Sequence, residues 1–227
     1  MPAIATTTNS GSSHVGVGLY SIADVARLSG AHPETVRRWL SEKQGIVRRH
    51  FRRAEKLLTF RELMEVHFVQ MFRAEGVSFQ TIRKASEAAS REFNSKYPFT
   101  VKRFDTDGRT VFATLLKENS SDVLVQDLER GQYVFRSIVR PFFRKLEYRG
   151  ADQHVSRFWP REKRGRVVLD PIRKFGKPID AETGIATSVI YEAVNAGGGQ
   201  SPADVARWLN IPPAAVAAAV AFERSLA

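Results

Sequence analysis

Residues 21–40, SIADVARLSGAHPETVRRWL, constrain the fold more than any other stretch of the 227-residue chain. Ser21 begins a helical pattern as its cap, with Asp24 at the third helical position, and Gly30 ends it. Pro33 suits the first turn of a second helix, because its missing N–H would be unpaired there in any case. The stretch therefore predicts two short helices that meet at a tight turn, a helix-turn-helix.

The second of these helices separates apolar from basic residues. Val36 and Trp39 lie on an apolar stripe that faces inward, which leaves Thr35, Arg37 and Arg38 on or near the exposed side. An arginine in this place can bind a DNA phosphate or the O6 and N7 atoms of guanine. The alternative is a packed corner of two helices whose arginines are only solvated.

A basic segment follows directly and favours the DNA-binding interpretation. Residues 37–56 hold eight basic side chains and only two acidic ones. We expect this segment to form a wing whose side chains lie against the DNA backbone, where the release of counterions favours binding without reading sequence. The expected wing contacts are Arg48, Arg49, Arg52 and Arg53.

Helical spacing continues beyond the wing and then gives way to other patterns. Apolar residues recur at helical intervals in 60–72 and 79–93. From residue 99 the segments FTVKRF and RTVFATL flank an Asp-Gly pair, and DVLVQDL and QYVFRSIV are rich in β-favouring residues, so a hairpin or small sheet is expected. Residues 130–166 contain eleven basic and three acidic side chains, which is typical of a basic linker.

The last third of the chain predicts a second compact unit. RVVLDP has the pattern of a short strand, and SVIYEAVNAG, ADVARWL and AAVAAAVAFERSL have helical patterns with stop or start signals. The predicted fold class is α+β, mostly α: a winged helix-turn-helix domain, a small β segment and a compact helical C-terminal domain. The expected divisions are a flexible tail at 1–18, the winged domain at 19–97, the β segment and basic linker at 98–156, and the C-terminal domain at 157–227.

The N-terminal half resembles the MerR family of winged helix-turn-helix regulators. The resemblance covers about residues 19–93 and rests on YSIADVARLSG, ETVRRWL and LLTFRELMEVHFVQMFRAEGVSFQTIRKASEAA in that order. It implies DNA contacts by Thr35 and Arg37 on the recognition helix and by the arginines of 48–53 in the wing. The wing lacks the family's usual glycine and tyrosine pattern, and the helix after Ser78 is shorter than the family's dimerisation coil.

The C-terminal stretch, about residues 166–224, is similar to a small domain found in antitoxins of VapB type. The similarity rests on the DP strand end, the GKP loop, the TGIAT turn and the closing alanine-rich helix. It implies a PIN-like ribonuclease toxin as partner. Basic residues just before and within this stretch would attract the carboxylates of such a nuclease. The expected toxin contacts are Arg157, Arg161, Arg164 and Arg166.

Composition excludes several other functions. The chain has no cysteine, so thiolate metal sites, disulfides and cysteine nucleophiles are ruled out, and its five histidines lack metal-ligand spacing. The net charge of +11 favours a polyanionic partner. Without a long apolar run or signal-peptide pattern we expect a cytoplasmic protein that does not enter membranes and needs no cofactor or metal.

These patterns support one main hypothesis and two alternatives. The main hypothesis is a non-enzymatic, dimeric antitoxin of a type II toxin-antitoxin system that binds double-stranded DNA at its own promoter. The first alternative is a transcription regulator whose C-terminal domain senses a ligand or dimerises. The second is a nucleic-acid-processing enzyme that uses scattered carboxylates, and the candidates for these are Asp122, Asp127, Glu129 and Asp152.

Overall fold

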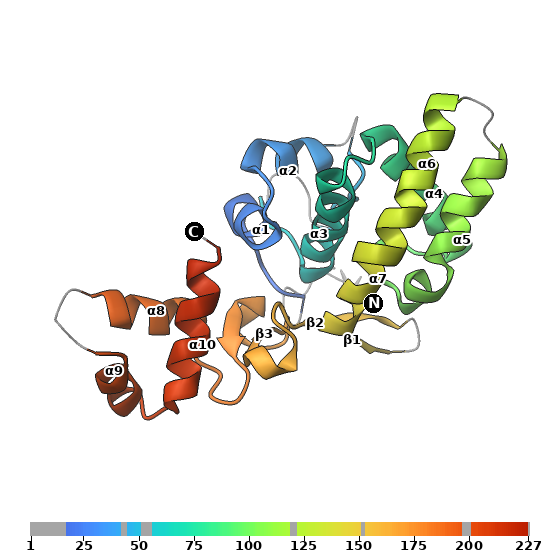
Figure 1. Cartoon of the computed structure of the whole chain (residues 1–227). Coiled ribbons are helices and arrows are strands. Elements are labelled where there is room, and N and C mark those ends of the chain that lie inside the picture. The colour runs from blue at the N-terminus through green and yellow to red at the C-terminus, as the bar shows by residue number, and fades with distance from the viewer. Residues whose placement is uncertain are drawn as a thin grey trace, which may run out of the picture.

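The computed structural model describes residues 17–41, 45–50, 56–118, 122–150, 153–196 and 201–226, and the side chains of 116–118 and 122–125 are not described. Within these residues helices predominate, and one four-stranded antiparallel sheet lies between two helical groups (Figure 1). The fold is therefore α+β and mostly α, as the sequence predicts. The expected tail is described only from Val17, whose carbonyl accepts a hydrogen bond from the N–H of Phe60 at 2.9 Å.

The helix-turn-helix forms as expected. Helix α1, Ile22–Ser29, begins with a capping box between Ser21 and Asp24 and ends at Gly30, which adopts the left-handed conformation. Helix α2, Pro33–Trp39, starts at the proline, and its Val36 and Trp39 are buried. The segments around Tyr20 and Leu58 form an antiparallel bridge, which joins the chain before α1 to the chain after the wing.

Two longer helices support this motif. Helix α3, Phe60–Ala74, begins with a second capping box, between Thr59 and Glu62, and helix α4, Phe79–Glu92, is capped by Ser78. Both agree with the predicted ranges. The large apolar side chains of α3 are buried except for the partly buried Met71, and they form the centre of the main core. Helix α1 packs on one side of α3 and the helices that follow α4 pack on the other (Figure 1).

The prediction of a hairpin or small sheet from residue 99 is wrong. After a 3₁₀ turn at Pro98–Thr100 the chain forms helix α5, Lys102–Glu118, and then helix α6, Asp122–Val134. A π-helical turn at Phe135–Val139, the short helix α7 at Arg140–Phe142 and a 3₁₀ turn at Phe143–Lys145 continue from α6. The predicted strands DVLVQDL and QYVFRSIV are therefore helical as well.

Two glycines within α5 and α6 make room for aromatic rings of the neighbouring helical segment. Gly108 lies within α5, where a Cβ atom would be 2.5 Å from Cε2 of Phe135. Gly131 lies within α6, where a Cβ atom would be 2.6 Å from Cε1 of Phe112 on α5. Gly108 is therefore not a turn residue, because its missing side chain provides room for a phenylalanine of the neighbouring helical segment.

The first two strands of the sheet lie in the segment expected to be a linker, whose first part is helical. Its strands follow the chain in the order β1 (Leu146–Arg149), β2 (His154–Phe158), β3 (Val167–Leu169) and β4 (Pro178–Asp180). Only β3 was predicted. The expected division between residues 156 and 157 passes through β2, so the sheet joins the two parts of the chain that the division was to separate.

Three C-terminal helices pack on the far end of this sheet, as predicted. They are α8 (Thr187–Asn195), α9 (Pro202–Trp208) and α10 (Pro213–Arg224), and they bury a second apolar cluster. Alanines of α10 let it approach α8 and α9 closely. No single helix among the described residues is long and apolar enough to cross a membrane, although α9 and α10, bent by 119°, pass that test as a pair.

Direct contacts fix the C-terminal unit to the helix-turn-helix. The hydroxyl of Tyr20 donates to the carbonyl of Gly176 at 2.7 Å, and the N–H of Leu19 donates to the carbonyl of Phe175 at 2.9 Å. On the other side, Nη1 of Arg27 on α1 lies 2.8 Å from Oε2 of Glu223 on α10. The first and last helices are therefore in contact (Figure 1).

Candidate nucleic-acid interface

Helix α2 presents its basic residues to solvent. Trp39 and Val36 anchor one side of the helix in the core, while Arg37 and Arg38 are exposed and Thr35 is half-buried. Arg37 forms an ion pair with Glu34 one turn earlier. Because this pair is solvent-exposed on both sides, it costs little to break, and the guanidinium can turn to a DNA phosphate or base.

The segment after α2 folds back against the end of that helix. The carbonyl of Trp39 accepts hydrogen bonds from the N–H groups of Ile46 and Val47 at 2.9 and 3.1 Å, and both side chains are buried. Arg48 then faces solvent. The predicted contacts Arg52 and Arg53 lie outside the described residues.

Arg49 differs from its neighbour Arg48. Its Nη2 donates to the carbonyl of Leu57 at 2.7 Å, and its Nε lies 3.5 Å from Oε1 of the buried carboxylate of Glu62. The N–H of His50 donates to the same oxygen at 2.7 Å. Arg49 thus ties both ends of the wing to the start of α3, and its charge is largely balanced within the protein.

The basic surface extends beyond the residues that the sequence singles out. A cleft of about 340 Å³ separates the wing from α4, and its cations are Arg48, Arg49, Arg83 and Lys96. Nζ of Lys96 donates to the carbonyl of Arg49 at 2.5 Å, and burial lowers the pKa of Lys96. Arg83 and Lys96 were missed because only the fold brings α4 and the loop after it beside the wing.

The four arginines expected to contact a toxin are mostly engaged within the protein. Arg157 lies 2.7 Å from Asp170, and Arg166 lies 2.9 Å from Asp180. Arg161 donates to the carbonyl of Ala221 at 3.0 Å. Arg164 is exposed, and within the described part of the chain no ion pair or hydrogen bond of its side chain is found.

Two buried aspartates explain the DP motif after β3 and the sequence PID that forms β4. Asp170 follows β3 and accepts from Arg157 and from the N–H of Ile172 at 3.1 Å. Asp180 ends β4 and accepts from Arg166 and from the N–H of Thr183 at 2.9 Å. Although burial raises the pKa of Asp180, these hydrogen bonds hold it below its ordinary value. Both motifs therefore close the ends of strands.

Among the described residues, the carboxylates considered for an enzyme do not gather into a metal-binding site. Asp127 on α6 accepts from the N–H of Ser78 at 3.0 and 3.1 Å and from the hydroxyl of Thr81, so it caps the start of α4 from a neighbouring helix. Asp152 and the side chain of Asp122 are outside the described part. In the ranges that are described, no group of three metal-ligating side chains occurs.

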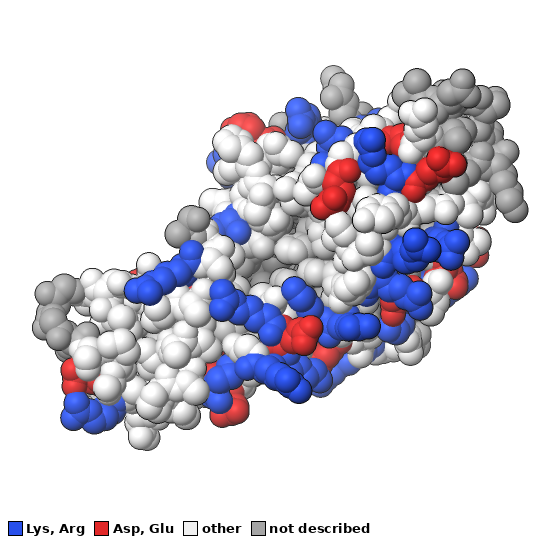
Figure 2. All heavy atoms as spheres, viewed as in Figure 1, with Lys and Arg blue, Asp and Glu red and all other residues white. Residues whose placement is uncertain are grey.

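The surface over the C-terminal helices carries fewer charges than the rest of the face seen in Figure 2. In the view of Figure 2, Lys and Arg side chains spread over its middle and right, whereas the surface over α8–α10 at the lower left is largely uncharged. That region includes Trp208 on α9, which is 71% exposed, and Val189 on α8, which is 50% exposed.

Comparison with known proteins identifies the class of the N-terminal half. Residues 20–89 match the family described as MerR HTH family regulatory protein, so they form a MerR-family helix-turn-helix domain. This range contains α1 to α3, the wing segment and most of α4. The match is confined to this helix-turn-helix half of the chain and supports a DNA-binding role for it.

Two mycobacterial proteins resemble more of the chain. A protein of Mycobacterium tuberculosis (strain ATCC 25618 / H37Rv) named "Putative antitoxin VapB45" is 28% identical over 149 residues, which are 62% of this chain and 61% of that protein. The crystal structure of Rv2018 from Mycobacterium tuberculosis superimposes with a TM-score of 0.76 at 23% identity and covers 91% of this chain and 99% of that one. The second likeness shows that the whole arrangement of helices and sheet is a known fold.

Proposed function

We propose that this protein is an antitoxin of a type II toxin-antitoxin system, which binds its own promoter as a dimer and neutralises a PIN-like ribonuclease. The proposal that the protein binds DNA rests on one observation. Arg37 and Arg38 are exposed on a helix whose opposite side is anchored in the core by Trp39. The proposal that it neutralises a toxin is supported by the name of the antitoxin relative and by the VapB-like motifs of the C-terminal sequence.

A dimer is proposed from the geometry of DNA recognition. One small winged module buries too little surface for strong specific binding, and two-fold symmetry of a dimer would match two half-sites of an inverted repeat. Light scattering on the complex with promoter DNA tests this part. A single protomer on a site without a repeat at saturation would contradict it.

The C-terminal surface offers a toxin two kinds of contact. Trp208 exposes a large apolar side chain of the type that carries binding energy at interfaces. Arg164 is the member of the predicted arginine set whose side chain has neither an ion pair nor a hydrogen bond among the described residues, whereas Arg161 donates to the carbonyl of Ala221. An arginine of this kind could pair with the metal-holding carboxylates of the nuclease.

The test separates the two activities in the full-length chain. The variant Arg37→Ala/Arg38→Ala should lose repression of a reporter placed behind the promoter and still rescue growth when co-expressed with the ribonuclease encoded beside the gene. The variant Trp208→Ala/Arg164→Ala should show the opposite result. Failure of the wild-type protein to rescue growth or to bind the nuclease would reject the antitoxin proposal and leave a DNA-binding regulator.

A further inference from the structure

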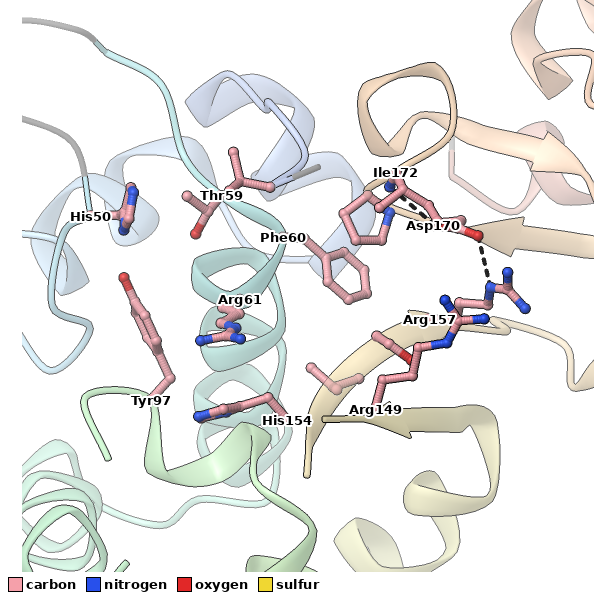
Figure 3. Close-up of a pocket in the computed structure, with 14 residues that line it drawn as sticks. His50, Thr59, Phe60, Arg61, Tyr97, Arg149, His154, Arg157, Asp170 and Ile172 are labelled. Atoms are coloured by element: carbon pink, nitrogen blue, oxygen red, sulfur yellow. Dashed lines mark hydrogen bonds and ion pairs between the residues drawn. The ribbon is translucent and has the colours of Figure 1, made fainter. Parts of the chain in front are cut away.

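A second basic cleft lies between the DNA-binding half and the sheet, and neither the helix-turn-helix nor a toxin contact accounts for it. Its volume is about 340 Å³. One wall is formed by the end of the wing and the first turn of α3, and the other by β1, β2 and the loop after β3 (Figure 3). The polar side chains that matter here are His50, Arg61, Tyr97, Arg149 and His154.

Positive charge in this cleft exceeds negative charge. Arg61 and Arg149 are exposed, and within the described residues neither forms an ion pair with a carboxylate. Asp170 is the carboxylate of the lining, and it is already bound by Arg157 and by the N–H of Ile172, as the dashed lines of Figure 3 mark. Two guanidinium groups are therefore directed to a cavity without a matching anion of the described chain.

A buried hydroxyl provides a second, independent indication of a ligand. Tyr97 is only 5% exposed, and its hydroxyl makes no hydrogen bond of ordinary geometry among the described residues. Figure 3 shows the hydroxyl between His50 and the side of α3 that carries Arg61. Because burial raises the pKa of Tyr97, the phenol stays protonated and can donate. Buried polar groups normally have a partner, so an unsatisfied donor at the wall of a basic cavity calls for an acceptor.

From this arrangement we propose that the cleft binds a small phosphorylated molecule. Guanidinium groups match the geometry of phosphate oxygens, and the phenol of Tyr97 can supply a further donor. The volume is in the range of small-molecule sites, and the apolar wall of Phe60, Val155 and Ile172 suits the remainder of such a ligand. A DNA backbone is the other source of phosphate, but the exposed arginines of α2 are not part of this lining.

Occupation of the cleft would affect DNA binding. His50 and Arg61 belong to the DNA-binding half, whereas Arg149 and His154 belong to the sheet, so a ligand would bridge the two. Its negative charge would also neutralise Arg61 beside the wing and weaken the attraction of DNA phosphates. The bound anion therefore lowers DNA affinity, and by linkage DNA lowers affinity for the anion by the same factor.

The first experiment measures anion binding without DNA. Calorimetric titration of the full-length protein with inorganic pyrophosphate, at constant ionic strength set with sodium chloride, compares the wild type with Arg61→Gln/Arg149→Gln. The matched control Arg136→Gln/Arg224→Gln removes the same charge from exposed sites outside the cleft. We expect the cleft variant to bind at least about tenfold more weakly and the control to bind like the wild type. Equal binding by the cleft variant and the control would overturn the proposal.

The second experiment distinguishes a small ligand from the DNA backbone. The cleft variant should bind a DNA duplex as the charge-matched control does when no anion is added, and pyrophosphate should weaken DNA binding about fivefold or more in the wild type only. Tyr97→Phe, which keeps the ring and removes the donor, should reduce pyrophosphate affinity severalfold with unchanged thermal unfolding. If instead the cleft variant loses as much DNA affinity as Arg37→Ala/Arg38→Ala without any anion, the cleft is part of the DNA surface and the proposal is wrong.

Discussion

Gly108 on α5 lies against the ring of Phe135, which follows α6 in the chain, and there is no room between them for a methyl group. The relationship is reciprocal, because Gly131 on α6 lies in the same way against Phe112 on α5. Each helical segment therefore supplies one glycine and one buried phenylalanine to the contact. This arrangement lets α5 and α6 pack closely enough to bury both rings in the main core.

Replacing either glycine with alanine should destabilise the protein. Alanine stabilises an exposed helical position by about 1 kcal/mol relative to glycine. At Gly108 or Gly131 the added Cβ would collide with an aromatic ring, and overpacking of this kind costs about 1–3 kcal/mol. Urea unfolding of Gly108→Ala and Gly131→Ala measures the change. Thr114→Ala, at an exposed position of α5, is the matched control and should raise stability slightly; an equal gain at Gly108 would contradict the packing described here.

The same contact shows where sequence reasoning failed. The alternation in FTVKRF and RTVFATL, with Asp-Gly between them, fits a hairpin. Phe104, Gly108, Val111, Phe112 and Leu115 fit one face of a helix equally well. The choice depends on Phe135, which is distant in the sequence and fills the space beside Gly108. A local pattern cannot contain that information.

Helix ends, by contrast, could be predicted because their signals are local. The capping boxes of Ser21 with Asp24 and of Ser201 with Asp204 are both present in the structure, and α2 and α9 both start at a proline. The candidate DNA surface was only partly predictable. Arg48 and Arg49 are adjacent and chemically equal in the sequence, and only the fold places Glu62 beside one of them.

That difference predicts distinct effects for adjacent arginines. Arg48→Ala should leave the free energy of unfolding unchanged. It should reduce the slope of the logarithm of DNA affinity against the logarithm of salt concentration by about one, as expected for one lost phosphate contact. Arg49→Ala leaves the buried carboxylate of Glu62 without its cation and should lower the free energy of unfolding by about 1–3 kcal/mol. Urea unfolding and DNA titrations at several salt concentrations test both. Equal stability of the two variants would show that Arg49 does not brace the wing.

Recognition by α2 should depend on Arg37 and Arg38 in a sequence-specific way. A side chain that reads a base contributes about 1–3 kcal/mol of discrimination between the correct site and a mutated one, whereas a phosphate contact affects all sequences alike. We expect Arg38→Ala to reduce promoter affinity by this amount and to leave binding to unrelated DNA nearly unchanged. A parallel loss on both kinds of DNA would assign Arg38 to the backbone.

The ion pair between Arg27 and Glu223 should stabilise the contact of the C-terminal unit with the helix-turn-helix. Glu223 is buried and also accepts from the hydroxyl of Thr187, while the side chain of Arg27 is 40% exposed. Because of that exposure we expect Arg27→Ala to cost only about 1 kcal/mol. A double-mutant cycle with Glu223→Gln isolates the pair, and Arg224→Ala, one residue further along α10, serves as control. A coupling energy of zero would mean that apolar packing alone joins the two parts.

Stability should fall in mild acid because of His67 on α3. Its ring stacks on Phe142 with a centroid distance of 4.8 Å and meets Phe158 edge-on at 5.4 Å. Burial, with a smaller contribution from the positive charge of Lys145, lowers the pKa of His67 from 6.5 to about 4. Between these pH values the unfolded chain binds more protons than the folded one, so the free energy of unfolding decreases as pH falls from about 6.5 to about 4.

The full loss over this window is about 3 kcal/mol, since the pKa of His67 is lowered from 6.5 to about 4 and each unit of pKa difference corresponds to about 1.4 kcal/mol. Urea unfolding of the wild type and of His67→Phe between pH 7 and pH 4 measures it. The phenylalanine variant keeps an aromatic ring between Phe142 and Phe158 and removes the proton-binding site, so its stability should depend less on pH in this window. Identical pH profiles, or an NMR titration that finds the His67 imidazole charged at pH 6, would show that the ring is open to protons in the folded state.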